Sequence, residues 1–404
     1  MPDNKTIEAT AKSLRALFDL PRYIVVRVER WAGWGRLTLV PKATCFRCPV
    51  CSELGPAQLH RLRPLRDLDI GRRHIELRVQ TYRSGCITCG RPVVPLNIAR
   101  RYARCTRRLE QVLFRLTGDS TVKAVAKRME LDWETVKDAE VRYIRGLLRK
   151  RNLDGIRRIG IDEVSYQKGH KYLTLVTDLD RHRVIYVTHG NDGRSIGRFI
   201  TWLGPQRARK IKVVVTDMHD PYLKILRKRL PNAALVFDHF HVSKVVHEAL
   251  DEIRRRLQRE LSPADRRVIK NQRYVLLRAR ETLNKKQHVS LQELLAANTD
   301  LTAGYILKEA FRDVFNASTR RDGRRRLKAW EAQVRESNVP ELLKVLKTID
   351  RRRAGIEAFF QYRVANGMAE GFNNVVGTIK KQAYGFHDRD YLRLKILRTC
   401  GKLE

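Results

Sequence analysis

Acidic residues are scarce in this sequence. Its 404 residues include 83 lysines and arginines but only 44 aspartates and glutamates, which leaves a formal net charge of +39. So large an excess of one sign indicates a polyanionic partner, and nucleic acid is the first candidate. The basic residues are spread along the whole chain, which excludes a neutral enzyme with a single basic tail.

Long apolar runs and targeting signals are also absent. No stretch approaches the ~18 apolar residues that indicate a membrane-spanning helix, and the first residues lack the pattern of a secretory signal. We therefore expect a cytosolic protein without a membrane partner. The sequence has no internal repeat, and its 43% hydrophobic content is enough for packed cores in two or three domains.

The first hundred residues predict a small β-rich module. A helical pattern at 5–19 precedes strand patterns at 23–30 and 36–41. A further strand pattern at 74–82 lies between two groups of cysteines.

Those cysteines are the clearest local motif of the module. Five of the seven cysteines fall between residues 45 and 89. In a reducing cytosol, clustered cysteines indicate metal ligands rather than disulfides. Two Cys-x-x-Cys pairs supply the four thiolates that a tetrahedral structural Zn²⁺ site requires, and the strand between them suits a zinc ribbon. The predicted zinc ligands are Cys48, Cys51, Cys86 and Cys89.

Cys45 leaves this ligand set open, because it forms another Cys-x-x-Cys pair with Cys48. Pro49 and Val50 make a compact turn before Cys51, which favours the later pair and leaves Cys45 as the spare. The alternative for the whole group is a set of reduced structural cysteines.

Residues 121–150 have the pattern of a helix-turn-helix. Apolar residues recur at helical spacing in Thr121–Met129 and again in Trp133–Lys150, and Asp132 in the turn between them is placed to cap the second helix. That geometry matches a DNA-reading motif, although an ordinary helical hairpin has the same pattern. Basic residues favour the DNA-reading motif, and we expect DNA contacts from Lys123, Lys127, Arg128, Lys137 and Arg142.

From residue 157 the pattern changes to alternating strands and helices. Three β-rich segments within 156–190 predict an antiparallel meander, and apolar strands at 211–217 and 233–238 alternate with helices. This order indicates a mixed α/β sheet. Between 250 and 362 the strand pattern disappears, and the sequence is helical and rich in arginine.

Three acidic residues of this region suit metal binding. Asp162 lies inside the first strand, Asp217 ends a later strand, and Glu370 lies on the last helical segment. A carboxylate in an apolar strand is costly unless a partner offsets its charge, and a divalent cation is such a partner. Taken singly, each aspartate has a turn or cap residue as its alternative. The joint pattern favours a two-Mg²⁺ site for phosphodiester chemistry.

Four stretches carry a resemblance to a known family. They are GIDEVS at 160–165, TDMHDPY at 216–222, FDHFHV at 237–242 and NGMAEGFNNVVGTIKKQAYGF at 366–386. In order and spacing the chain resembles a bacterial insertion-sequence transposase of the DDE type, in the ISL3 family. The resemblance spans nearly the whole chain, and the last stretch is its most specific part.

The resemblance implies a multidomain fold with an N-terminal zinc ribbon and helix-turn-helix, then an α/β RNase-H-like catalytic core interrupted by an all-α insertion. Asp162, Asp217 and Glu370 match the DDE triad of that family, which binds two Mg²⁺ ions, or Mn²⁺ in their place. The corresponding boundaries are 1–98 for the ribbon region, 99–153 for the helix-turn-helix region, 154–250 for the first part of the core, 251–362 for the insertion and 363–404 for the core helix that carries Glu370.

Further residues are placed near the DNA by the same resemblance. Asp238-x-x-His241 resembles a signature near the active site, with a locally satisfied helix-start histidine as the alternative, and Trp330 matches a tryptophan that stacks on a flipped base, with a core position as its alternative. Contacts to the end of the element are expected from Asn366, Asn373, Asn374, Lys380 and Lys381. Glu163 should point to the opposite sheet face from Asp162.

These implications together predict a transposase that binds the terminal inverted repeats of its insertion sequence and target DNA. It would catalyse Mg²⁺-dependent strand cleavage and strand transfer as a homodimer or higher oligomer, in the bacterial cytoplasm at the nucleoid. Two alternatives stay open at this point: a structure-selective RNase-H-like nuclease or resolvase, and a domesticated, non-catalytic DNA-binding protein.

Overall fold

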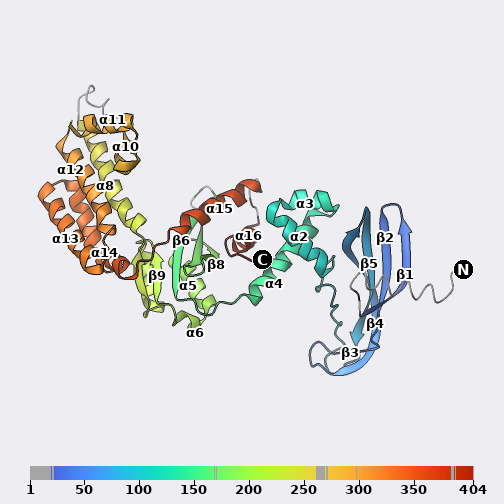
Figure 1. Ribbon diagram of the computed structural model, residues 1–404. Coiled ribbons are helices and arrows are strands. Elements are labelled where there is room, and N and C mark those ends of the chain that lie inside the picture. Colours follow the sequence, from blue (N-terminus) through green and yellow to red (C-terminus); the bar gives the residue numbers. More distant parts are fainter. Residues whose placement is uncertain are drawn as a thin grey trace. The chain divides into compact units, whose positions relative to one another are not determined.

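The computed structural model of the chain describes residues 20, 22–167, 169, 171–260, 269, 272–296, 298–383, 386 and 388–403. The chain falls into two units, Met1–Arg151 and Asn152–Glu404 (Figure 1). The helix expected at 5–19 lies outside the described residues. No helix in the described ranges is both long and apolar enough to cross a membrane.

The N-terminal unit begins with a five-stranded sheet in the order β1-β2-β5-β4-β3. Alternate residues of the central strands, such as Leu39 and Leu77, are fully buried on one face, as the period-two pattern predicts. Gly33 has a φ of +73°, which the tight turn from β1 to β2 requires. The strands are β1 Tyr23–Trp31, β2 Trp34–Pro41, β3 Cys45–Arg47, β4 Leu54–Ile70 and β5 Arg73–Ser84.

The described part of the N-terminal unit also contains three helices, α2 Arg107–Asp119, α3 Val122–Met129 and α4 Trp133–Lys150. Their apolar faces meet in one small core that includes Leu113, Val125 and Val136. Thr121 caps α3 by accepting a hydrogen bond from the Ala124 N–H, and Glu130 ends that helix in a left-handed conformation. Asp132 stands at the cap position of α4 but makes no side-chain cap hydrogen bond, which corrects its expected capping role.

The C-terminal unit is built on a mixed sheet with the order β10-β9-β6-β7-β8. The first three of its strands along the chain form the predicted antiparallel meander, while β9 pairs in parallel with both β6 and β10. The strands are β6 Arg158–Gln167, β7 Lys171–Asp178, β8 Arg183–His189, β9 Val213–Thr216 and β10 Ala234–Phe237.

Helices cover both faces of this sheet. On one face, α5 (Gly193–Leu203) and α7 (Asp220–Arg229) bury Phe199 and Leu226 against β6, and the short α6 (Pro205–Ala208) joins α5 to β9. On the other face, α15 (Met368–Gln382) lies beside β6 (Figure 1), and α16 (Arg389–Thr399) packs against β8. The sheet edge formed by the carboxyl ends of β6, β9 and β10 is therefore flanked by helices from distant parts of the chain.

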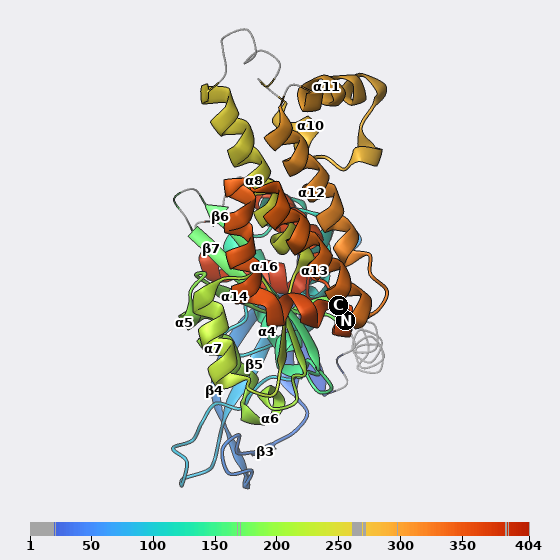
Figure 2. The ribbon, with the colours of Figure 1, turned by 90° about the vertical axis from the view of Figure 1, so that its left-hand side faces the viewer.

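Between β10 and α15 the described residues form helices and no strand. These helices gather into one bundle in both views (Figures 1 and 2). They are α8 His239–Glu260, α10 Arg273–Leu277, the 3-10 turn Arg280–Thr282, α11 Lys285–Ala296, α12 Thr299–Phe315, α13 Arg320–Ser337 and α14 Pro340–Tyr362. The bundle core runs on into the sheet, because Gly355 of α14 approaches the Phe237 ring so closely that a side chain there would clash.

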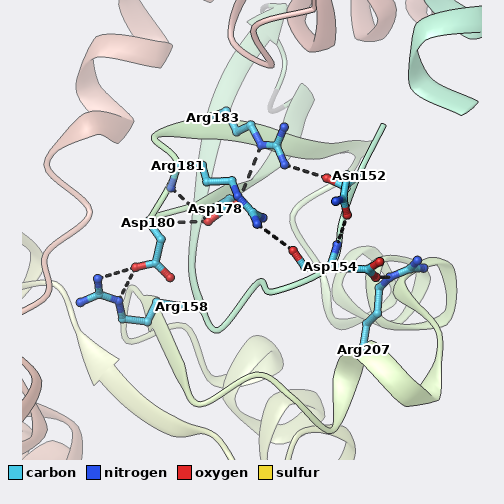
Figure 3. A network of polar contacts seen from close by, with 8 residues as sticks. All are labelled: Asn152, Asp154, Arg158, Asp178, Asp180, Arg181, Arg183 and Arg207. Carbon is cyan, nitrogen blue, oxygen red and sulfur yellow. Dashed lines mark hydrogen bonds and ion pairs between the residues drawn. The ribbon is translucent and has the colours of Figure 1, made fainter. Parts of the chain in front are cut away.

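A polar network fixes the start of the C-terminal unit to the β7–β8 turn (Figure 3). Asp178 is fully buried and accepts hydrogen bonds from the backbone N–H groups of Asp180 and Arg181. Arg181 also donates to the carbonyl oxygen of Asp154 at 2.8 Å, and Arg183 donates to that of Asn152 at 2.8 Å. The first residues of the unit are thus held by guanidinium groups that share the Asp178 carboxylate.

We expect Asp178→Asn to lower the free energy of unfolding of the C-terminal unit by roughly 2 to 3 kcal/mol, because the buried carboxylate is the common acceptor of this network. Hydrogen exchange of the β7 and β8 amides in the full chain measures the loss. Asp154→Asn is the matched control, since its exposed side chain pairs only with Arg207 among the network residues, and it should change stability by less than about 0.5 kcal/mol. Equal effects of the two substitutions would contradict the central role of Asp178.

Candidate catalytic site and metal centre

The four predicted cysteine ligands come together in the N-terminal unit. Cys48 and Cys51 lie in the turn between β3 and β4, and Cys86 and Cys89 follow the end of β5. The long β4–β5 hairpin brings the two turns together, and all four sulfur atoms lie within 4.8 Å of one another. Cys45 is exposed on β3 and stands outside this group.

The sulfur geometry fits a tetrahedral ion. Zinc–sulfur bonds of about 2.3 Å place tetrahedral sulfurs about 3.8 Å apart, and Cys51 and Cys86 are 3.6 Å apart. The N–H of Cys51 lowers the pKa of Cys48 to about 6, whereas the other thiols of the group raise the pKa of Cys89 to about 12. A bound cation would allow all four thiols to ionise, because it offsets the repulsion among closely spaced thiolates.

The basic residues of the helix-turn-helix divide into two groups. Lys123, Lys127 and Arg128 are exposed on α3, and Lys137 of α4 is half-buried with its ammonium 5.6 Å from the centre of the Trp133 ring. These side chains remain candidates for DNA contact.

Arg142 belongs to the other group, and its predicted DNA contact is corrected. Its Nε donates to the carboxylate of Glu110 at 2.7 Å, and Glu110 is fully buried on α2. Arg100 pairs with the second oxygen of the same carboxylate at 3.4 Å. Arg142 therefore fixes α4 to α2, because its guanidinium neutralises a buried charge of the domain core.

In the C-terminal unit, the parallel pairing of β6 with β9 aligns the two predicted catalytic aspartates. The register pairs Gly160 with Val215, so Asp162 and Asp217 each stand two residues beyond the same rung. β10 continues the alignment, because its last residue, Phe237, pairs with Thr216 and Asp238 follows. Adjacent strands are about 4.8 Å apart, so the three aspartates line one edge of the sheet.

The environment of Asp162 is that of a partly buried carboxylate next to other charges. Burial raises the pKa of Asp162, and the nearby charge of Asp217 raises it further. The Glu163 N–H, the Asn373 amide and His241 lower the pKa, which places His241 near this carboxylate. Asp217 is oriented by the backbone N–H of His219, which donates to it at 3.1 Å.

Glu370 lies in the first turn of α15 and is exposed. Asn373, one turn later on the same helix face, donates to Asp162 at 2.9 Å, so this face of α15 lies over the aspartates. Among the residues that the structure describes, only the four cysteines form a group of metal-ligating atoms within 4.8 Å. The carboxylates of Asp162, Asp217 and Glu370 do not form such a group.

The asparagines and lysines predicted to contact DNA have different surroundings. Asn366 is buried, with its backbone N–H donating to Asp238 at 3.3 Å and its amide 3.5 Å from the Ile161 carbonyl, so its predicted DNA contact is corrected. Asn373 orients Asp162 instead of facing DNA. Lys380 donates to the Ser165 carbonyl at 3.1 Å. Asn374 and Lys381 are exposed on α15.

Trp330 is a core residue, and its predicted base-stacking role is corrected. The side chain is 2% exposed, its indole N–H donates to the Leu307 carbonyl at 2.8 Å, and its ring centre is 4.5 Å from that of Phe311. Both contacts come from α12, so the indole is held inside the bundle by that neighbouring helix. The core alternative considered for this residue is the observed one.

Glu163 lies close enough to Asp217 to be affected by its charge, which the sequence did not indicate. It stands on the opposite face of β6 from Asp162, as expected, where Ile161 packs in the core under α5 and α7. Burial raises its pKa, and the charge of Asp217 raises it further. Asn191 donates to it at 3.4 Å. Only its position next to Asp162 in the sequence could have drawn attention to it.

Two known protein families match parts of this chain. Residues 159–396 match the family described as "Transposase" under the ISL3 type of DDE transposases, and residues 94–144 match the "Helix-turn-helix domain of transposase family ISL3". The second match covers α2, α3 and most of α4, which confirms the predicted helix-turn-helix.

Two relatives are similar over most of their length. The chain is 32% identical to the transposase for insertion sequence element IS1001 of Bordetella parapertussis, over 95% of this chain and 97% of the relative. It is 30% identical to the transposase for insertion sequence element IS1557 of Mycobacterium tuberculosis, over 84% and 82% of the two chains. A solved Mos1 transposase paired-end complex with left transposon end matches at 14% identity and a TM-score of 0.16, covering 62% of this chain and 84% of that one.

We expect the purified protein to contain about one zinc ion per chain, held by the four grouped cysteines. Cys86→Ser should abolish the bound zinc and destabilise the N-terminal sheet, because the ion joins the two cysteine turns. Elemental analysis with circular dichroism measures both effects. Cys45→Ser is the matched control and should keep the full zinc content, since Cys45 stands outside the group. Zinc loss in both variants would contradict this ligand set.

Proposed function

The chain belongs to the ISL3 family of insertion-sequence transposases, and from that premise we propose that it binds the terminal inverted repeats of its own element and catalyses Mg²⁺-dependent DNA strand cleavage and strand transfer. The single observation that carries the proposal is the alignment of Asp162 with Asp217 at the ends of two adjacent parallel strands. Such an edge provides two carboxylates at one point, which is what a bound pair of divalent ions requires.

Asp162, Asp217 and Glu370 are the residues that would hold Mg²⁺, or Mn²⁺ in its place. The donor set suits a hard cation, because the pKa of Asp162 is raised by burial and by the charge of Asp217, and a cation would relieve both. When bound, the ions activate a water molecule or a DNA 3′ hydroxyl and neutralise charge on the phosphate. Asn373 fixes the orientation of Asp162, and His241, at the start of α8 after Asp238, is the residue that would contact the scissile phosphate.

The rest of the chain serves this chemistry in separate parts. The zinc-binding region 1–98 and the helix-turn-helix region 99–153 bind the end of the element, with Lys123, Lys127, Arg128 and Lys137 as DNA contacts. The RNase-H-like core comprises 154–250 and 363–404, and the helical insertion 251–362 closes over the DNA with Asn374 and Lys381 nearby on α15. A homodimer or higher oligomer pairs the two ends, in the cytoplasm at the nucleoid.

We expect Asp162→Ala, Asp217→Ala and Glu370→Ala each to reduce cleavage and strand transfer by roughly a thousandfold or more, because each removes a ligand of the catalytic ions. Gel assays on oligonucleotide duplexes that carry the repeats flanking the gene measure both reactions. Binding to the same duplexes should be unchanged, since the ribbon and helix-turn-helix carry it.

Asp390→Ala is the matched control, since it removes an exposed carboxylate of the same unit on α16 and should leave both reactions intact. Strand transfer that survives the loss of Asp217 would refute the triad. Cleavage without joining in the wild-type protein would identify a nuclease or resolvase, and binding without cleavage would identify a DNA-binding protein.

Lys127→Ala and Arg128→Ala should each weaken binding to the repeat duplex and reduce the salt slope of log K by about 1, because each contact to phosphate releases a counterion. Arg142→Ala should leave the salt slope unchanged. It should instead lower the free energy of unfolding by about 2 kcal/mol, because it removes the closest cationic partner of the buried Glu110 carboxylate. Binding titrations at several salt concentrations, with thermal denaturation of each variant, separate the two effects. A reduced slope for Arg142→Ala would contradict its structural assignment.

A further inference from the structure

His219 connects Asp217 to a carboxylate on the neighbouring strand. Its backbone N–H donates to the Asp217 carboxylate at 3.1 Å, and its ring nitrogen Nδ1 lies 3.9 Å from Oε1 of Glu163. We propose that Glu163 is a positioning residue, which acts through the His219 side chain to hold the Asp217 carboxylate in the orientation that binds the metal ions. This inference rests on the proposed transposase function and deepens it, because it gives a residue outside the triad a part in metal binding.

The strand register explains why Glu163 reaches His219. Gly160 of β6 pairs with Val215 of β9, and β9 ends one residue later. Glu163 therefore lies beyond the end of β9, beside the turn that carries Asp217 and His219 into α7. Its side chain points to the face of the sheet that α5 and α7 cover, so the start of α7 is within its reach.

The ring of His219 rests on a side chain that is fixed in the core. Its centre is 4.9 Å from that of the Tyr222 ring, in an edge contact, and Tyr222 is 1% exposed. The hydroxyl groups of Tyr222 and Thr174 are 3.0 Å apart, and Thr174 donates its hydrogen to the Gly190 carbonyl at 2.6 Å. The Tyr222 hydroxyl must then donate to Thr174, so it leaves Glu163 to His219.

The two facing atoms both lack a hydrogen bond. Glu163 Oε1 and His219 Nδ1 are buried, and neither atom has a hydrogen-bond partner among the residues that the structure describes. The other carboxylate oxygen of Glu163 accepts from the Asn191 amide at 3.4 Å. A buried polar atom without a partner is costly, and a shift of about 1 Å would bring the two atoms to hydrogen-bond distance. The pair is thus able to fasten the turn that carries Asp217.

Glu163 acts on the metal site without being a ligand. It stands on the opposite face of β6 from Asp162, so its carboxylate and the triad do not share a coordination sphere. Ligating carboxylates bind ions more tightly when hydrogen bonds fix them in advance, and loss of the group that fixes them weakens metal affinity roughly 10- to 100-fold. The His219 N–H already bonds one oxygen of Asp217, and Glu163 holds the residue that provides this N–H.

Mn²⁺ binding to the full-length, zinc-loaded chain tests the proposal. Electron paramagnetic resonance of free Mn²⁺ gives the dissociation constant of the binding that Asp217→Ala removes. Glu163→Ala and His219→Ala should each raise this constant about tenfold. The double substitution should raise it no further, because the two side chains act in series. Glu163→Gln should restore most of the affinity, since its amide oxygen still accepts from His219.

Strand transfer at increasing Mg²⁺ concentrations gives a second measurement. In Glu163→Ala the apparent KM for Mg²⁺ should rise about tenfold while kcat at saturating Mg²⁺ stays close to that of the wild type, because the ligands themselves are intact. A variant that is merely less well folded would lose kcat and keep KM.

Asp192→Ala is the matched control, because Asp192 caps α5 at the same edge of the sheet by accepting from the Ser195 N–H at 2.9 Å. It should lower the melting temperature by roughly 2 to 4 °C and leave the Mn²⁺ dissociation constant unchanged. This comparison separates lost stability from lost positioning.

Three results would overturn the positioning role: an unchanged Mn²⁺ constant in Glu163→Ala, an equal loss in Glu163→Gln, or losses that add in the double variant. Each of them leaves the proposed function intact, as long as the wild-type chain transfers strands and Asp217→Ala does not. If Asp217→Ala removes no Mn²⁺ binding, the metal site of the proposed function is refuted and the positioning role with it.

Discussion

The parallel pairing of β6 with β9 is the interaction on which the candidate catalytic site depends. It places Asp162 and Asp217 at equal height on neighbouring strands, although 55 positions separate them in the sequence. A slip of one residue would move one of these carboxylates to the opposite face of the sheet. The register is held by the apolar core, because Ile159, Ile161 and Val214 pack on the face covered by α5 and α7 and tolerate no such shift.

Much of this architecture could be predicted, and the failures have a common physical origin. The meander, the strands β9 and β10 and the helix-turn-helix follow from periodicity, and the grouping of the four cysteines follows from their spacing. β4 was not predicted, since Pro56, Pro64 and frequent arginines interrupt its strand pattern. Whether a single side chain such as Trp330 or Arg142 is buried or faces DNA depends on which helix packs against it. The residue type alone does not determine this packing.

The residue pattern already grouped Asp162, Asp217 and Glu370 as a candidate two-metal site, and the resemblance then matched them to the DDE triad. Residue patterns placed each carboxylate at a strand end or on a helix, where caps and turns are common. What the structure adds is their common edge and the Asn373 bond that holds Asp162. Not all of the basic residues behind the net charge of +39 can contact DNA. Arginines such as Arg142, Arg183 and Arg352 form ion pairs with acidic side chains within the chain. Only the remainder is available for DNA.

The hydrogen bond from Asn366 to Asp238 has a consequence for how the bundle is built into the sheet. It joins the residue that precedes α8 to the segment that follows α14, so the two ends of a 128-residue excursion meet at one carboxylate. The helical bundle is thus one long insertion whose two ends are hydrogen-bonded to each other. Since the entropy cost of closing a loop grows only slowly with its length, helices could be added to or removed from the bundle during evolution without moving the aspartates. Because its two ends are joined in this way, the bundle is a module that can vary in length while the sheet stays the same.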